Sequence, residues 1–215
     1  VNTISQGMKR RGLLAAAAVT SIGLALPRAR AAAAAEAQPV DALDSALIAV
    51  MKAGSAGKSF AARYAMLKPV VEASFDLELI LQNSAGLLWP QIPAAQKTEL
   101  GKLFRQYTIA TYVSNFNAYG GQHFTTDPDI RRAGDSRIVS TTLNEHDGKS
   151  VKLAYVMREA GGTWKITDVL FEGTISKVAA QRSDFSGLID PGNAARLIEA
   201  LKKKIATLSG GAIRD

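Results

Sequence analysis

The spacing of apolar residues predicts helices in the first half of the chain. From Asp41 to about position 53, and again from Phe60 to Val71, apolar side chains recur every three or four positions. This spacing places them on one face of a helix. A shorter helical segment begins at Phe75 and stops at a glycine. The longest pattern follows Pro93 and runs to about position 117, where a Gly-Gly pair soon ends it.

In the second half the period changes from 3.6 to two. Residues 151–158 alternate between apolar and polar side chains, which predicts a strand. Positions 138–145 are rich in β-branched residues, and Asp147-Gly148 is a hairpin turn signal. Further strands are expected from Trp164 to Phe171 and between positions 122 and 132, and helices are expected near 176–187 and 193–208. This order predicts an α+β fold, a curled antiparallel sheet of about four strands packed against several helices, which encloses either a solid core or a pocket.

The first thirty-five positions have the features of an export signal. Lys9-Arg10-Arg11 precedes an apolar, uncharged run from Gly12 to Leu26, and Pro27 and small residues around Ala29 follow. This order is typical of a cleavable signal peptide. The run is shorter than the ~20 residues that span a bilayer, so a retained anchor is the weaker interpretation. We therefore expect residues 1–35 to be signal peptide and cleavage region, exported by the general or the twin-arginine route, and residues 41–208 to form one domain.

Removal of the signal changes the meaning of the chain's charge. The formal net charge is +7, but residues 1–35 hold five basic residues and no acidic one, so the remainder carries +2. A nucleic-acid interface needs basic residues clustered on the folded domain, and the run Lys202-Lys203-Lys204 is more typical of a solvated helix face. The chain has no cysteine, which excludes thiol catalysis, cysteine metal sites and disulfides.

Candidate catalytic groups are few. His123 and His146 are the only histidines, and they lack carboxylates at ligand spacing, so no metal site and no cofactor are predicted. Asp168 lies on the same strand face as Trp164, where burial with a nearby tyrosine would suit proton-transfer chemistry. The simpler interpretation is that Asp168 bonds to backbone or pairs with Arg182.

Three stretches carry a resemblance to a known family. The last of them runs Trp164-Lys165-Ile166-Thr167-Asp168-Val169 and continues with Glu172-Gly173, Arg182 and Phe185; the others are Phe75 to Ile80 with Gly86, Trp89 and Pro93, and Phe104 with Tyr107, Tyr112, Phe116 and Tyr119-Gly120. From about Asp41 to Lys204 the chain resembles the MlaC family, also called the toluene-tolerance auxiliary family. Thr174-Ile175 departs from the more usual pair at that place and suits a divergent branch.

The resemblance implies a periplasmic phospholipid carrier without a catalytic site. Such a carrier passes lipid between an outer-membrane lipoprotein complex and an inner-membrane ABC transporter with a membrane-anchored, lipid-presenting subunit, and so serves outer-membrane lipid asymmetry. One branch, HpnM, is associated with hopanoid lipids. The acyl chains would lie between sheet and helices, with the headgroup near solvent. Neither the lipid nor the direction of transport follows from the sequence.

The facing apolar stripes suggest which side chains line such a cavity. For each, ordinary core packing is an equal interpretation. The expected lipid-binding residues are Phe75, Leu79, Phe104, Tyr107, Val139, Val151, Leu153, Tyr155, Val169 and Phe171. We interpret Asp168, Glu172 and Arg182 as structural. Two other functions stay open from the residues alone: an isomerase or dehydratase that uses Asp168 with a tyrosine, and a scaffold with a solid core.

Overall fold

The computed structural model describes residues 34–213. The expected signal peptide therefore lies outside the described residues, apart from its last two positions. Within the described part, no helix combines the length and the apolar character needed to cross a membrane.

The helices form where the apolar spacing predicts them. Their bounds are α1 Gln38–Ser55, α2 Phe60–Ser74, α3 Leu77–Ala85, α4 Ala94–Asn115, α5 Lys177–Ser186 and α6 Ala195–Ser209, with a 3-10 helix, η1, at Gly86–Gln91. Three of them begin at a side chain that accepts a backbone N–H: Ser59 for α2, Asp76 for α3 and Ser176 for α5. Such caps satisfy donors that have no partner inside the helix. Pro69 lies within α2 and does not end it.

The strands form one antiparallel sheet. Their bounds are β1 His123–Thr126, β2 Arg131–Ala133, β3 Ser136–Asn144, β4 Ser150–Ala160, β5 Thr163–Phe171 and β6 Ile175–Ser176. The order is β1-β3-β4-β5-β6, and β2 pairs with the other end of β3 beside β1. The sheet thus has six strands rather than the expected four or so. The expected strand at 122–132 is two short ones, and β6 is too short to show an alternating pattern.

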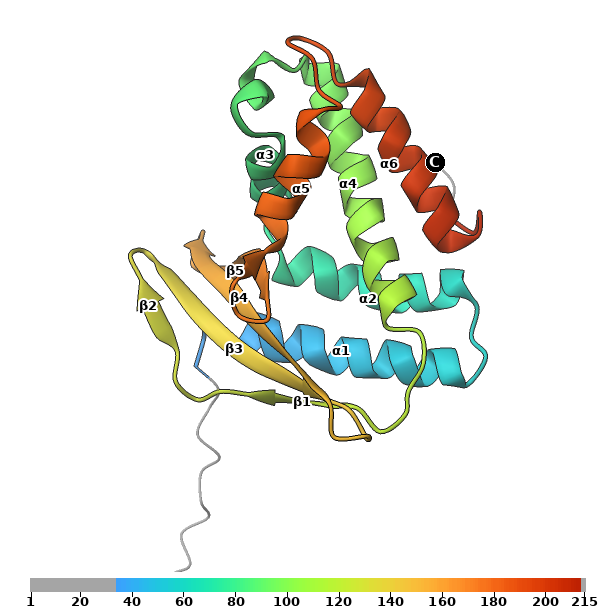
Figure 1. Cartoon of the computed structure of the whole chain (residues 1–215), viewed down its shortest axis with the longest axis vertical. Helices are drawn as coiled ribbons and strands as arrows, with labels where there is room; N and C mark the ends of the chain where they lie inside the picture. The colour runs from blue at the N-terminus through green and yellow to red at the C-terminus, as the bar shows by residue number, and fades with distance from the viewer. Residues whose placement is uncertain (1–33, 214–215) are drawn as a thin grey trace, which may run out of the picture. The chain divides into compact units, whose positions relative to one another are not determined.

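The sheet curls around α1 (Figure 1). The helices α3 to α6 lie above the layer that the sheet forms with α1 and α2 (Figure 1). α1 and α2 lie side by side, and α4 rises from α2 toward η1, with α5 on one side and α6 on the other (Figure 1). The junction between α2 and α3 is fixed to the sheet: Phe75 bridges to Ile166 of β5, whose carbonyl accepts the N–H of Asp76 at 2.9 Å.

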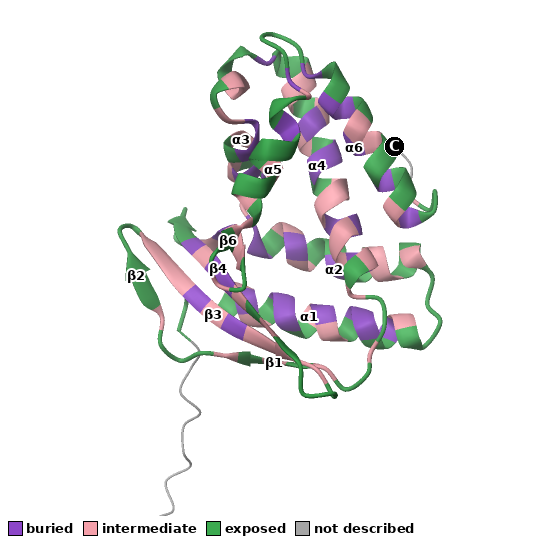
Figure 2. Ribbon diagram, in the orientation of Figure 1, coloured by how far each residue is buried: buried purple, intermediate pink, exposed green. Residues whose placement is uncertain are grey.

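One hydrophobic core joins the sheet to the helices. The inner side of α1 and the middle of β3 are buried, whereas β2 and the tips of the hairpins are exposed (Figure 2). Phe104 of α4 packs edge-on against Phe185 of α5, with ring centroids 6.4 Å apart. Burial of such side chains is the main favourable contribution to folding. The α+β architecture expected from the sequence is confirmed.

Candidate functional site

A cavity of about 680 Å³ lies between the inner face of the sheet and the helices α3, α4 and α5. This volume is within the ~300–1,000 Å³ range of small-molecule pockets. Its walls combine apolar and aromatic side chains with a few polar ones. The expected residues that line it are Phe75, Phe104, Tyr107, Val151, Leu153, Tyr155, Val169 and Phe171.

The strand register explains why these side chains gather. Residues directly opposite in an antiparallel pair point to the same face of a sheet. Leu153 of β4 pairs with Phe171 of β5, and two residues along β4 Tyr155 pairs with Val169. Leu143 of β3 adds to this face because it pairs with Val151. Three strands therefore present one continuous apolar wall.

The opposite wall comes from α4. Phe104, Tyr107, Thr108 and Thr111 lie at intervals of three and four and so share one side of the helix. The hydroxyls of Thr108 and Thr111 each donate to the carbonyl four residues earlier, at 2.8 Å. Their polar atoms are thereby satisfied within the helix, and both threonines can face an apolar ligand at little cost.

Two of the expected residues are placed elsewhere. Leu79 is half-buried on α3, and its neighbour Ile80 lines the cavity in its place. One residue along a helix is a rotation of about 100°. Val139 faces the same side of the sheet as its partner Tyr155 but is fully buried in the core.

Polar residues surround the open side of the cavity. Exposed or half-buried groups come from the end of α4 and the loop after it, from the β3–β4 hairpin and from α5: Asn115, Asn117, Gln122, Glu145, Lys177, Gln181 and Asp184. A ligand with an apolar part and a polar end would be satisfied by this arrangement, because unpaired polar groups are costly only away from water.

A buried acid lies on α1 next to Tyr155, on the same side of the sheet as the cavity, and the sequence analysis missed it. Asp44 of α1 is only 5% exposed, and one of its oxygens accepts the hydroxyl of Tyr155 at 3.4 Å. Its second oxygen and the Thr141 hydroxyl have no partner among the described residues. Burial raises the pKa of Asp44 from 3.8 to about 8, so the carboxyl is neutral at pH 7. Burial likewise raises the pKa of Tyr155 and of Tyr112, which lines the cavity.

A sequence signal for Asp44 exists. One stripe of α1 has buried side chains at intervals of four, three and four residues: Val40, Asp44, Leu47 and Met51. An acidic residue inside an apolar stripe is the pattern that would have identified it.

Asp168 lines the cavity, and three local hydrogen bonds engage its carboxylate. Its carboxylate accepts the N–H groups of Val169 and Val178, at 2.7 and 3.1 Å, and the hydroxyl of Ser176 at 2.5 Å. Ser176 in turn caps α5 by accepting the N–H of Ala179. These bonds hold β5 to α5. Pairing with Arg182 does not occur; the Arg182 guanidinium lies against Gly86 instead.

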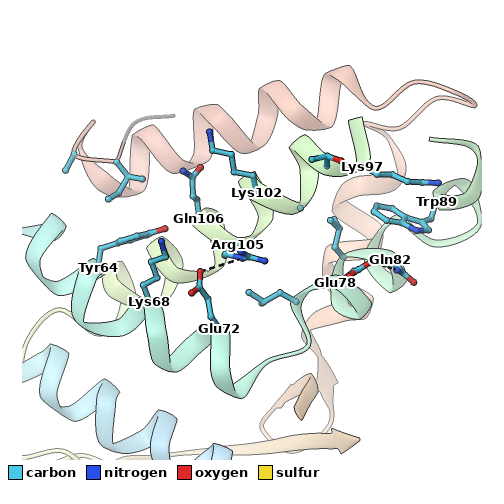
Figure 3. Close-up of a pocket in the computed structure, with 16 residues that line it drawn as sticks. Tyr64, Lys68, Glu72, Glu78, Gln82, Trp89, Lys97, Lys102, Arg105 and Gln106 are labelled. Carbon is cyan, nitrogen blue, oxygen red and sulfur yellow. Dashed lines mark hydrogen bonds and ion pairs between the residues drawn. The ribbon is translucent and has the colours of Figure 1, made fainter. Parts of the chain in front are cut away.

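A second hollow of about 880 Å³ lies on the other side of α4 (Figure 3). Its lining includes four basic residues, Lys68, Lys97, Lys102 and Arg105, and two acidic ones, Glu72 and Glu78. Arg105 is 3.7 Å from Glu72, and Lys97 lies over the Trp89 ring at 5.4 Å. Charged walls of this kind suit water or a polar partner. The apolar cavity is therefore the better candidate for an apolar ligand.

Metal ligands do not gather in the described part of the chain. Between positions 34 and 213 no three histidine, aspartate or glutamate side chains are close enough to hold an ion.

Comparison with known proteins adds a family and a fold. The sequence profile of the family described as MlaC protein matches residues 41–203. The chain is also similar to a solved structure, the phospholipid-binding protein from Ralstonia solanacearum in complex with a phospholipid. The TM-score is 0.69 and the identity 21%, over 81% of this chain and 98% of that one. No curated protein matches the chain in sequence.

Proposed function

This chain belongs to the MlaC family, and from that premise we propose that it binds a lipid whose acyl chains occupy the cavity between the sheet and α4. The observation that carries the proposal is the cavity itself: a continuous apolar wall from three strands, an aromatic wall from α4, and polar groups at the open side. The phospholipid named for the Ralstonia solanacearum protein supports it, because the two folds correspond.

The proposed lipid contacts are the eight expected residues that line the cavity together with Leu143, Ile80 and the threonines of α4. The polar residues around the opening would face the headgroup. The lipid is a phospholipid or a hopanoid-type lipid, as in the HpnM branch of the family.

Energetics favour a carrier over a permanent store. Burial of an acyl chain is worth about 0.8 kcal/mol per CH₂ relative to water. Two chains of ~15 carbons would therefore give roughly 24 kcal/mol, which exceeds the ~18–21 kcal/mol at which non-covalent affinity saturates. A bilayer is equally apolar, so exchange with a membrane is close to balance. The protein would hold lipid firmly in water and release it at a membrane.

We place this carrier in the periplasm, after removal of residues 1–35, with residues 41–208 as the binding domain. Its partners would be an outer-membrane lipoprotein complex and an inner-membrane ABC transporter with a lipid-presenting subunit. The function involves no catalytic step. Sequencing of the amino terminus of the protein recovered from the periplasm would test the cleavage, with a start near residues 31–36 expected and an intact leader contradicting it.

Native mass spectrometry of the protein purified from the periplasm without detergent tests the function itself. We expect a species heavier than the polypeptide by the mass of one lipid, which denaturing extraction would release and identify. A protein that arrives empty, and that stays empty after incubation with labelled vesicles, would contradict the proposal.

A further inference from the structure

Exposed large apolar side chains are rare in the described residues, and two of them are neighbours at the edge of the sheet beside the cavity. Phe171 of β5 is 43% exposed and Ile175 of β6 is 56% exposed. Met66 and Leu87 are the other two, and both lie on helical segments away from the cavity lining. Scattered apolar side chains need no explanation, but a pair adjoining a cavity does.

The strand register links this pair to the interior. Thr141 pairs with Leu153, Leu153 with Phe171, and Phe171 with Ile175, so one row of side chains crosses four strands on the same face. Exposure rises along the row: Thr141 is buried at 2%, Leu153 is intermediate, and Phe171 and Ile175 are exposed. Leu153 and Phe171 line the cavity, whereas Ile175 does not. The apolar wall therefore continues past the cavity to the edge of the sheet.

The edge is held in place rather than loose. β6 has two residues and leads directly into α5. Ser176, next to Ile175, bonds to Asp168 and caps the helix. The turn between the strands has two residues with positive φ, Glu172 at 51° and Gly173 at 71°, and its backbone is bonded from Thr174 to Phe171 at 3.2 Å. The hairpin therefore holds Ile175 at the surface, and its exposure is a property of the folded structure rather than of a loose edge.

We propose that Phe171 and Ile175 form a lip over which the acyl chain of the lipid leaves and enters the cavity. This inference rests on the proposed lipid-binding function and deepens it, because it assigns the route of exchange. An acyl chain halfway out of the cavity exposes methylene groups to water, and an apolar surface along the route covers part of them. The lip then lowers the free-energy barrier for a lipid that is entering or leaving. A fully bound lipid need not contact Ile175.

This placement has a kinetic signature. A residue that contacts the chain only in transit changes the rates of loading and unloading by the same factor and leaves the equilibrium occupancy unchanged. Loss of contact with even one methylene group slows exchange about fourfold. A residue that contacts the bound lipid would instead change occupancy, because it acts mainly on release.

The test measures lipid exchange with Ile175→Ser, with Leu87→Ser as the matched control. Leu87 is 90% exposed on η1 and lies outside the cavity lining. The probe is a tail-labelled fluorescent phosphatidylethanolamine in phosphatidylcholine vesicles that also contain a lipid-linked quencher. Uptake raises the fluorescence, and transfer from loaded protein to unlabelled vesicles measures unloading. Lipid occupancy at equilibrium is measured in parallel by native mass spectrometry.

We expect Ile175→Ser to load and unload at least about fourfold more slowly at unchanged occupancy, and Leu87→Ser to behave as wild type. Wild-type rates for Ile175→Ser, equal slowing by Leu87→Ser, or a lower occupancy in Ile175→Ser would each overturn the lip. A wild-type dimer that becomes monomeric in Ile175→Ser would also overturn it, because Phe171 and Ile175 would then form an interface between two copies of the chain. If the wild-type protein takes up no lipid, the proposed function fails first, and that result is distinct from all of these.

Discussion

Replacement of Asp44 by asparagine should remove a specific pH dependence from the stability of the protein. In the folded state Asp44 is buried and its pKa is raised to about 8. In the unfolded chain its pKa returns to about 3.9. Between these values the folded protein keeps a proton that the unfolded chain has lost. Stability is therefore fully present below about pH 4 and falls as the pH rises toward 8.

The size of the effect follows from that one proton. A difference of one bound proton changes the free energy of unfolding by about 1.36 kcal/mol per pH unit at 25 °C. Between pH 5 and pH 7 the ionisation of Asp44 in the unfolded chain therefore lowers the stability of the wild-type protein by about 3 kcal/mol. The asparagine side chain of the variant has no proton to lose, so the difference in stability between the two proteins should shift by that amount in favour of the variant. Other titrating groups are common to both and cancel.

Urea unfolding of the delipidated protein, followed by circular dichroism at pH 5, 6 and 7, measures this difference. Delipidation matters because a bound ligand adds its own stabilisation. Asp135→Asn is the matched control, since Asp135 is exposed in the turn between β2 and β3. Wild type and Asp44→Asn curves that stay parallel across this range would refute the assignment of a buried, neutral carboxyl.

Two further substitutions test local features of the fold. Gly54→Ala should destabilise the protein by about 1–3 kcal/mol, because a Cβ there would lie 1.9 Å from the Asn117 carbonyl oxygen. Gly101→Ala in α4 should stabilise the protein by about 0.5–1 kcal/mol, because a Cβ there would have no atom within 4 Å and alanine favours the helix over glycine. Equal effects in urea unfolding would contradict this pair. Ser176→Ala should destabilise the protein by at least about 1 kcal/mol, because it removes both the α5 cap and the hydrogen bond to Asp168, with lipid occupancy unchanged. No change in stability would show that neither bond is needed.

Much of the fold could be predicted because its elements are long and strongly patterned. The stripe of α4 and the alternation of β4 each extend over many residues, and tight turns join β4 to its neighbours β3 and β5. The alternation of apolar side chains is why Leu153, Tyr155, Val169 and Phe171 could be assigned to one wall from the sequence. β2 and β6 have three and two residues, which is too short for a period.

The sequence could not show which inward-facing residues of an element pack in the core and which line the cavity. Alternation places Val139 on the inner face of β3, but whether a position on that face meets the core or the cavity depends on where the helices cross it. For Leu79, a difference of one residue in helix rotation moved the cavity contact to Ile80. The partnership of Asp44 with Tyr155 joins positions 111 residues apart, and no local pattern specifies that.

The central claim is that lipid occupies the cavity rather than the charged hollow on the other side of α4. Native mass spectrometry of two tryptophan variants tests it most directly: Leu153→Trp narrows the cavity, and Lys102→Trp narrows the hollow. Urea unfolding first establishes that both variants fold. We predict that Leu153→Trp binds less lipid than the wild-type protein and that Lys102→Trp binds as much. Full occupancy in Leu153→Trp together with loss in Lys102→Trp would show that the lipid lies on the other side of the helix.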